Sequence, residues 1–325
     1  MALTAPTFED VWRARERLEG FAAVTPMIGI ETDQRTSVFL KLESLQPIGS
    51  FKIRGALNKI FAARETERFS SVYTASAGNM AQGVAYAARE LEIPATVFVP
   101  DSAPRAKTDA VERLGATVIK VPYDEWWQIM QSGGRAGTPG LFIHPFADRD
   151  VMAGNGTIAL EILEQEPSVD TVLVPWGGGG LTCGIAATMR AAFPNTRIHH
   201  IRVYACEVEG AAPLTASLAA GKAMQIENEK SFIDGIGGRG VFPDMWPLAK
   251  ELVAGTLVVT VQQVADALAL MAVRARVIAE GAGAAPLAAA IHAPIEGMPQ
   301  RIVCVVSGGN IDTSVLTNIL SGNLP

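Results

Sequence analysis

Residues 171–181 read TVLVPWGGGGL, an apolar strand followed by Gly177, Gly178, Gly179 and Gly180 and then by a helical pattern. Four glycines between a strand and a helix allow several backbone N–H groups to turn toward one point, where the helix N-terminus adds positive potential. The junction predicts a phosphate cradle, with a plain flexible turn as the alternative. It lacks the third glycine of G-x-G-x-x-G and the lysine of a P-loop, so the phosphate belongs to neither a dinucleotide nor a nucleoside triphosphate.

Strand and helix patterns alternate on both sides of this junction. Short apolar or β-branched runs predict strands at 38–42, 71–74, 95–99, 117–121, 171–174, 198–206 and 301–306. Apolar periodicity predicts helices at 11–18 after a cap at Thr7, 81–92, 108–114, 156–166, 181–192 and from 264 to a stop at Gly281. This rhythm is typical of parallel sheets covered by helices, an α/β fold, and the glycine-rich residues 132–140 are expected to link its two halves.

Length and composition narrow the class of protein. A chain of 325 residues suggests about two domains. With 49% hydrophobic and 18% charged residues it is globular, and its net charge of −6 argues against nucleic acid as a partner. Its three widely spaced cysteines form no disulfide framework and no zinc site. His144, His199, His200 and His292 lack ligand spacing, so we expect them to be structural or on the surface.

The sequence carries no sign of secretion or membrane insertion. Residues 1–18 lack the apolar stretch of a secretory signal. No run reaches the roughly 18 uncharged residues of a membrane span. We therefore expect a cytoplasmic protein without a membrane partner.

A second motif, SFKIRGA at residues 50–56, places Lys52 between Phe51 and Ile53. Burial lowers the pKa of a lysine and makes its amine available as a nucleophile or a base. A surface lysine at the start of a helix is the alternative interpretation.

Two further motifs follow predicted strands. SAGNM at 76–80 is a loop of small residues entering a helix; its N–H groups suit a carboxylate, and its asparagine offers both a donor and an acceptor. SGGN at 307–310 comes after the last strand, where the ligands of parallel sheets bind, and its serine could hydrogen-bond a heterocycle. For each motif an ordinary turn is the alternative.

Together the four motifs resemble the threonine/serine dehydratase and serine racemase group of fold-type II pyridoxal-phosphate enzymes. Segments of the chain outside these four motifs also match the family, so the resemblance covers nearly the whole chain. It implies a tryptophan synthase β-like α/β fold of two domains, each with a mostly parallel sheet flanked by helices. Residues 1–61 and 147–325 would form a discontinuous large domain that binds the cofactor, and residues 62–146 a small domain with the substrate-carboxylate loop.

The resemblance also implies a role for each matching residue. Lys52 would form a Schiff base with pyridoxal 5′-phosphate and take the Cα proton of the substrate. Asn79 would bond the ring hydroxyl, Ser307 would face the ring nitrogen, and Glu280 would lie near the ring. The cofactor-binding residues would be Phe51, Lys52, Asn79, Gly177, Gly178, Gly179, Gly180, Leu181, Gly235 and Ser307. The substrate-binding residues would be Ser76, Ala77, Gly78, Asn79, Met80 and Phe146.

Some residues depart from the family pattern. Met80 replaces a histidine, and together with Phe146 and the tryptophans at 126–127 it favours a bulky β-substituent such as phenyl. Ordinary core packing of these side chains is the alternative. Ala77 replaces the serine that acts as a second base in racemases, which argues against racemisation.

Two other departures concern cations and regulation. Glu207 matches one carboxylate of the divalent-cation site found in part of the family, but Pro213 stands where the second is expected, so we expect no specific metal. Only 15 residues follow Asn310, so we expect no C-terminal regulatory domain like that of biosynthetic threonine dehydratases.

These inferences predict a pyridoxal-phosphate-dependent dehydratase. Its substrate would be a β-hydroxy-α-amino acid, either threonine or serine or a β-aryl analogue such as phenylserine, and its products an α-keto acid and ammonia. A small-molecule amino acid is thus the expected partner, and the resemblance implies a homodimer. Racemisation on the same cofactor and a non-catalytic cofactor-binding homologue are the alternatives.

Overall fold

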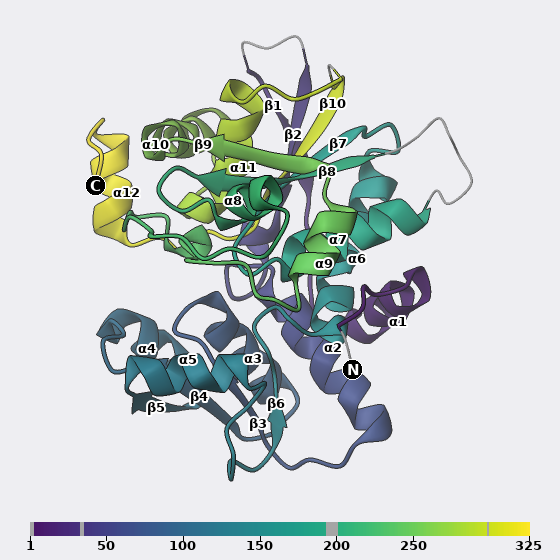
Figure 1. The fold of residues 1–325 in the computed structure, drawn as a ribbon, viewed down its shortest axis with the longest axis vertical. Coiled ribbons are helices and arrows are strands. Elements are labelled where there is room, and N and C mark those ends of the chain that lie inside the picture. Colours follow the sequence, from purple (N-terminus) through teal and green to yellow (C-terminus); the bar gives the residue numbers. More distant parts are fainter. Residues whose placement is uncertain (1–2, 33–35, 193–200, 298) are drawn as a thin grey trace.

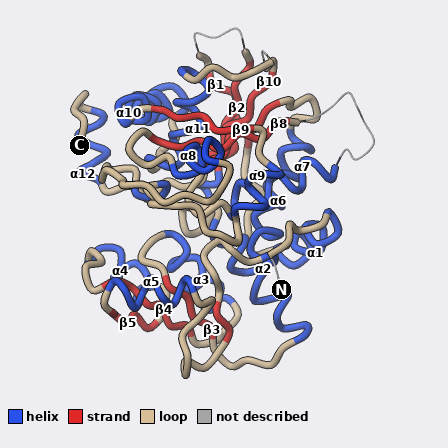
Figure 2. The backbone as a smooth tube through the Cα atoms, in the orientation of Figure 1, coloured by secondary structure: helices blue, strands red, loops and turns tan. Residues whose placement is uncertain are grey.

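The computed structural model describes residues 3–32, 36–192, 201–297 and 299–325. Within these ranges the chain forms two sheets (Figure 1 and Figure 2). The six-stranded sheet has the order β1-β2-β10-β7-β8-β9, and the four-stranded sheet has the order β5-β4-β3-β6. Of the described strand pairs, only β1 with β2 is antiparallel, so the predicted α/β class with mostly parallel sheets is confirmed.

The strands are β1 (Met27–Ile30), β2 (Ser37–Leu42), β3 (Val72–Ala75), β4 (Ala95–Pro100), β5 (Thr117–Val121), β6 (Leu141–Phe142), β7 (Thr171–Pro175), β8 (Arg202–Val208), β9 (Gly255–Val259) and β10 (Arg301–Val306). The α-helices are α1 (Phe8–Leu18), α2 (Lys52–Thr66), α3 (Asn79–Glu90), α4 (Arg105–Arg113), α5 (Tyr123–Gln131), α6 (Arg149–Gln165), α7 (Gly180–Ala192), α8 (Pro213–Ala220), α9 (Trp246–Leu252), α10 (Val261–Leu270), α11 (Gly281–His292) and α12 (Thr313–Leu320). Three short turns are η1 (Glu43–Leu45), η2 (Asp234–Ile236) and η3 (Met271–Ala275). None of the described helices has both the length and the apolar character that a membrane crossing requires.

The six-stranded sheet is buried on both faces. In β10, Ile302, Cys304 and Val306 pack with residues of α10 and α11 on one face. Val303 and Val305 of the same strand pack on the other face with residues of α6 and α7. This alternation is the period of two that a strand imposes, and the result is a sheet with helices on both sides.

The strands β3 to β6, with α3, α4 and α5, form a small lobe at the bottom of Figure 1. Val72 and Val97 pack with residues of α3 on one face of its sheet. Tyr73 and Phe98 pack with residues of α5 on the other face. Helix α2 lies against both α3 and α6, so it joins the small lobe to the large lobe, which holds the six-stranded sheet and its helices.

Helix boundaries follow local signals where the sequence supplies a cap. At the start of α1, the Asp10 N–H donates to Thr7 Oγ1 at 3.2 Å and the Thr7 N–H donates to Asp10 Oδ2 at 2.7 Å, which confirms the predicted cap. Helix α6 begins at Arg149, seven residues before the predicted start at 156, because the Asp148 side chain accepts from two N–H groups of its first turn.

Two expectations are wrong, and one falls partly outside the described residues. The helix predicted from 264 to Gly281 ends at Leu270; a π-helical turn follows, and Gly281 begins α11. A Cβ at Gly281 would lie 2.9 Å from Ile233 Cγ1, so this glycine allows close packing and is not a helix stop. Residues 132–140 lie between α5 and β6 within the small lobe and do not link the two halves. The described part of the strand predicted at 198–206 begins at Arg202, and residues 198–200, including His199 and His200, lie outside the description.

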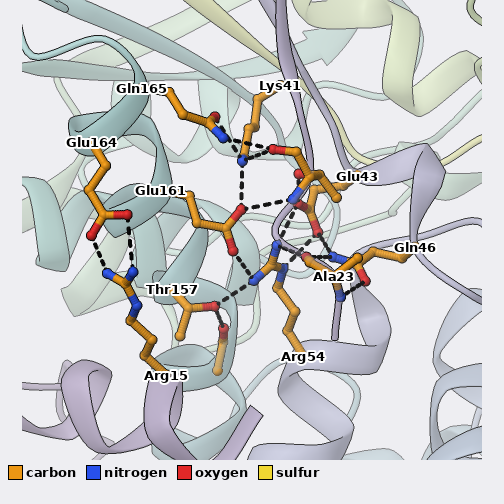
Figure 3. A network of polar contacts seen from close by, with 12 residues as sticks. Arg15, Ala23, Lys41, Glu43, Gln46, Arg54, Thr157, Glu161, Glu164 and Gln165 are labelled. Carbon is orange, nitrogen blue, oxygen red and sulfur yellow. Dashed lines mark hydrogen bonds and ion pairs between the residues drawn. The ribbon is translucent and has the colours of Figure 1, made fainter. Parts of the chain in front are cut away.

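A buried ionic network anchors the start of α2 (Figure 3). The Arg54 guanidinium donates to both oxygens of Glu43, at 2.8 and 2.9 Å, and lies 2.7 Å from a Glu161 oxygen. The other Glu161 oxygen is 2.6 Å from Lys41 Nζ. Two buried cations and two buried anions thus compensate one another, and they tie α2 to β2, η1 and α6.

Candidate active site

Three of the four motifs meet at one edge of the large sheet. Strands β7 and β10 are parallel neighbours, so the glycines after β7 and Ser307 after β10 leave the sheet at the same edge. The Phe51 N–H donates to the Ser307 carbonyl at 3.0 Å, and Ser50 forms a β-bridge with Gly308. Lys52 therefore begins α2 directly beside the carboxyl ends of these strands.

The glycine loop at 177–180 is glycine-specific because other groups approach its backbone. A Cβ at Gly178 would lie 2.2 Å from the Phe146 ring, and one at Gly180 would lie 2.6 Å from the Phe146 carbonyl oxygen. A Cβ at Gly177 would lie 2.8 Å from the Gly235 carbonyl oxygen, which places Gly235 beside the loop. Gly179 has a φ of +90°, a conformation that favours glycine.

This loop leaves its backbone donors available for an anion. In the described part of the chain, none of the N–H groups of Gly178, Gly179, Gly180 and Leu181 donates to a protein acceptor. They lie at the N-terminus of α7, a helix of 13 residues whose dipole favours negative charge. The donor set and the close-packed glycine cradle fit a phosphate group.

The Lys52 amine lies inside the structure. Its Nζ donates to the Pro145 carbonyl oxygen at 2.8 Å and lies 5.0 Å from the centroid of the Phe51 ring. Burial lowers the pKa of Lys52 to about 8, and the Glu280 carboxylate opposes this shift. Among the described residues, no carboxylate lies within ion-pair distance of the amine, and the lowered pKa makes the neutral fraction near physiological pH much larger than that of an ordinary lysine.

A second set of backbone donors lies in the small lobe. The loop at 76–80 follows β3, and Gly78 precedes the first residue of α3. The Gly78 N–H donates to Ser76 Oγ at 3.3 Å, whereas the N–H groups of Ala77, Asn79 and Met80 make no hydrogen bond with any described residue. The N-terminus of a helix of 12 residues with unpaired donors fits the carboxylate of an amino acid.

The Met80 side chain is buried in a hydrophobic core. It is 2% exposed and belongs to the hydrophobic core of the small lobe, with Ile53 and Val84 among its cluster. This burial favours ordinary core packing of Met80 over a place in the wall of a substrate pocket.

Asn79 reaches across to the large lobe. Its Nδ2 donates to the two oxygens of Glu280, at 2.9 and 3.1 Å, and its Oδ1 accepts from Asn310 Nδ2 at 2.8 Å. Burial raises the pKa of the Glu280 carboxyl to about 7, although the Asn79 hydrogen bond opposes the shift. The structure thus brings the loop at 76–80, the segment before α11 and the end of the SGGN motif together. Asn310 is the last residue of that motif, but no role was predicted for it.

Aromatic rings cover the glycine loop. Phe146 packs edge-on against His144, with the ring centroids 4.6 Å apart, and against Phe242 at 5.0 Å. Phe242 also contacts Trp127 of α5 at 5.6 Å, and Trp126 lies one ring further away from the site. Sequence reasoning missed Phe242, which stands in a loop without a recognisable motif.

The Glu207 carboxylate accepts hydrogen bonds from the N-terminal turn of α8. It accepts from the Leu214 N–H at 2.7 Å and from the Thr215 N–H and Oγ1 at 2.8 and 2.6 Å, so it satisfies the start of α8. Pro213 is the first residue of that helix. Within the described ranges, no group of three or more histidine, cysteine, aspartate or glutamate side chains is arranged to hold a metal ion.

Comparisons with known proteins agree with this geometry. The model of a family described as pyridoxal-phosphate dependent enzymes matches residues 18–308. An L-threonine ammonia-lyase from Geobacter sulfurreducens is 39% identical over 290 residues, which cover 88% of this chain and 70% of the relative. An L-threonine ammonia-lyase from Thermotoga maritima is 36% identical over 327 residues, which cover 98% of this chain and 79% of the relative.

A solved structure shows the same architecture. The structure of maize serine racemase matches with a TM-score of 0.85 and 30% identity, and the match covers 98% of each chain. The phosphate cradle, the carboxylate loop and the buried amine of Lys52 fit pyridoxal 5′-phosphate and an amino acid. The chain therefore belongs to the family of pyridoxal-phosphate-dependent enzymes and has their fold-type II architecture.

Proposed function

We propose that this protein removes water from a β-hydroxy-α-amino acid and releases an α-keto acid and ammonia. The observation that carries the proposal is the Lys52 amine, whose pKa burial lowers to about 8 and which lies beside the phosphate cradle. Such an amine is both a nucleophile and a base near neutral pH. Relatives that are named L-threonine ammonia-lyase support this choice of reaction.

The residues around Lys52 suggest how the cofactor binds. The glycine loop with the Leu181 N–H would hold the phosphate, and Phe51 and Gly235 would lie beside the ring. Ser307 would face the ring nitrogen and Asn79 the ring hydroxyl. When bound, pyridoxal phosphate supplies an electron sink for the charge that develops at the substrate Cα.

The chain's own residues would then move the protons. The free N–H groups at 76–80 would hold the substrate carboxylate and orient its Cα–H bond toward Lys52 Nζ. Lys52 would take that proton, after which the Cβ–O bond breaks and the hydroxyl leaves as water with one added proton. Addition of water to the released enamine, after it tautomerises, gives the keto acid and ammonia, so the net reaction consumes only the amino acid.

Racemisation is the second candidate, because maize serine racemase shares this fold. It needs a second proton donor on the opposite face of the Cα atom. Ala77, in the loop that would surround the substrate, has no such group. A non-catalytic cofactor-binding protein is the third candidate, and the retained amine of Lys52 argues against it.

The test is keto acid release from the protein loaded with pyridoxal phosphate. The substrates are L-serine, L-threonine and both diastereomers of phenylserine. The amount of D-serine formed from L-serine is measured in parallel. We expect turnover that is lost in Lys52→Ala, because no amine is left to take the Cα proton, and retained in Lys222→Ala, an exposed lysine on the surface. Turnover that survives in Lys52→Ala would overturn the mechanism, and D-serine without keto acid would favour racemisation.

The same panel addresses the β-substituent. We propose threonine or serine as the substrate, with phenylserine as the alternative that the rings of Phe146, Phe242 and Trp127 support. Pyruvate or 2-oxobutyrate as the main product would identify a threonine/serine dehydratase. Phenylpyruvate from phenylserine alone would identify a specialised pocket.

We also propose that the protein is a homodimer and that it is located in the cytoplasm. Light scattering would check the homodimer, and cell fractionation would check the location.

A further inference from the structure

Two residues of the large lobe hold one residue of the small lobe. Asn79, the first residue of α3, donates through Nδ2 to both oxygens of Glu280, which precedes α11. Asn310, which follows β10, donates through Nδ2 to Asn79 Oδ1 at 2.8 Å. We call Glu280 and Asn310 the Asn79 clasp. Asn310 donates to the amide oxygen of Asn79, and Glu280 accepts from its amide nitrogen.

The clasp residues are themselves fixed by the large lobe. Asn310 Nδ2 also donates to the Ile48 carbonyl oxygen at 2.9 Å, and the Glu280 N–H donates to the Gly308 carbonyl oxygen at 3.0 Å. A Cβ at Gly308 would lie 2.7 Å from Glu280 Oε1, and one at Gly49 would lie 2.6 Å from Asn310 Oδ1. Each residue is therefore held by a hydrogen bond to the large lobe, and its side chain packs closely against a glycine, although Asn310 itself is exposed.

The clasp leaves one donor of Asn79 unused. A primary amide carries two N–H hydrogens. The only acceptor of Asn79 Nδ2 among the described residues is the Glu280 carboxylate, which one hydrogen can satisfy, so the second hydrogen can serve another acceptor. We propose that Glu280 and Asn310 are positioning residues, which aim this second N–H of Asn79 at the ring hydroxyl of pyridoxal phosphate when the two lobes are docked. The inference rests on the proposed contact of Asn79 with that hydroxyl.

Charge at Glu280 should regulate the clasp. Burial raises the pKa of its carboxyl to about 7, and the nearby charges are Asp234 of η2, which raises the pKa, and Lys107 of α4, which lowers it. Lys107 and Asp234 form an ion pair that also joins the two lobes. The amine of Lys52 faces Glu280 from α2. The ionised carboxylate is the stronger acceptor, so the clasp is expected to weaken as the pH falls through about 7.

The experiment measures cofactor binding without turnover. Apoprotein is titrated with pyridoxal phosphate at about pH 6 and about pH 8, and the visible absorbance gives both the dissociation constant and the position of the band. We expect Asn310→Ala and Glu280→Ala to bind about five- to tenfold more weakly at the higher pH, the equivalent of one lost hydrogen bond each, and their band to shift. Asn318→Ala, an exposed asparagine on α12, is the matched control and should bind as the unaltered protein does.

Glu280→Gln separates charge from shape. It keeps an acceptor for Asn79 Nδ2, so its affinity at about pH 8 should stay within about threefold of the unaltered protein. Its loss of affinity toward about pH 6 should be smaller than in the unaltered protein, and the loss that is left comes from protonation of the Lys52 amine. A merely structural role would not move the absorbance band or its pH profile.

Two results would overturn the inference. One is unchanged cofactor affinity and spectrum in both Asn310→Ala and Glu280→Ala when Asn79→Ala binds more weakly. The other is an undiminished pH profile in Glu280→Gln. Because no turnover is measured, absence of keto acid in the previous experiment leaves this test intact, and failure of the clasp leaves the proposed dehydration standing.

Discussion

His144 illustrates how a single buried side chain shapes the site. Its Nδ1 accepts from the N–H groups of Phe146, at 3.2 Å, and Ala147, at 2.8 Å. Burial lowers the pKa of His144 to about 4, so the ring is neutral at physiological pH. The turn that it holds presents the Pro145 carbonyl to Lys52 and the Phe146 ring to the glycine loop. His144 is therefore a structural residue, as the absence of ligand spacing suggested.

His144 predicts a loss of stability in acid. Its pKa is about 4 in the folded chain and 6.5 in its ordinary environment, so between these values the unfolded chain binds more protons. The free energy of unfolding should therefore fall by about 2 kcal/mol as the pH drops from about 7 to about 5. Urea denaturation of the apoprotein at both pH values measures this change in the free energy of unfolding. Variants of His144 and of a second histidine separate its contribution from that of other titrating groups.

The matched variants are His144→Asn, which retains an acceptor, and His292→Asn, at the exposed end of α11. We expect His144→Asn to be less sensitive to acid than the unaltered protein, and His292→Asn to be about equally sensitive. Equal acid sensitivity in all three proteins would contradict the assignment of this titration to His144.

At the scale of elements, the junction between β7 and α7 is the best determined from sequence. The residues that make it a cradle are adjacent in the chain, and glycine tolerates both the φ of +90° at Gly179 and the close approach of Phe146 to Gly178. The segment from 264 to 281 shows the opposite case. Its apolar periodicity continues past Leu270, but α10 ends there, and Gly281, which packs closely on Ile233, is the first residue of the next helix.

Gly178→Ala should damage the cradle. The added Cβ would lie 2.2 Å from the Phe146 ring, so the ring or the loop has to move. Overpacking of this kind costs about 1–3 kcal/mol of stability, and we expect the affinity for pyridoxal phosphate to fall by about tenfold or more. Gly29→Ala in β1 is the control, because a Cβ there meets no atom within 4 Å. Titration of both apoproteins with pyridoxal phosphate makes the comparison, and equal affinities would refute the role of Gly178.

At the scale of the whole molecule, α2 holds the two lobes together and carries Lys52 at its first residue. The buried network of Arg54 with Glu43 and Glu161 fixes its first turn to the large lobe (Figure 3). Burial alone would raise the pKa of Glu43, but the charge and hydrogen bonds of Arg54 and a hydrogen bond from Thr25 lower it. The network is balanced in charge, so removal of one member leaves an unpaired buried ion.

Arg54→Met should therefore destabilise the protein strongly. It leaves Glu43 and Glu161 short of a buried cation, and breaking a buried pair in this way costs about 3–5 kcal/mol. The control is Arg190→Met, which removes an exposed ion pair with Glu251 and should change the free energy of unfolding by about 0.5 kcal/mol or less. Urea denaturation of both variants provides the values. Similar losses in the two variants would show that the buried network does not anchor α2.

The sequence alone predicted the α/β class, the family and the cofactor correctly. These properties depend on short motifs in which the residues that matter are neighbours, such as the glycines at 177–180 and Lys52 between Phe51 and Ile53. Backbone freedom, capping and strand periodicity act over a few residues, so they can be recognised without knowledge of the rest of the chain. The roles given to individual site residues remain predictions.

Tertiary structure alone decided which side chains meet. Asn79 contacts Glu280, 201 residues away in the sequence, and Asn310, 231 residues away. Lys52 donates to the carbonyl oxygen of Pro145, 93 residues away. Met80, next to Asn79 in the sequence, turns instead into the core of the small lobe. Such contacts depend on the packing of two lobes against each other. No local pattern encodes that packing, because burial and partner choice are set by the summed contacts of distant segments.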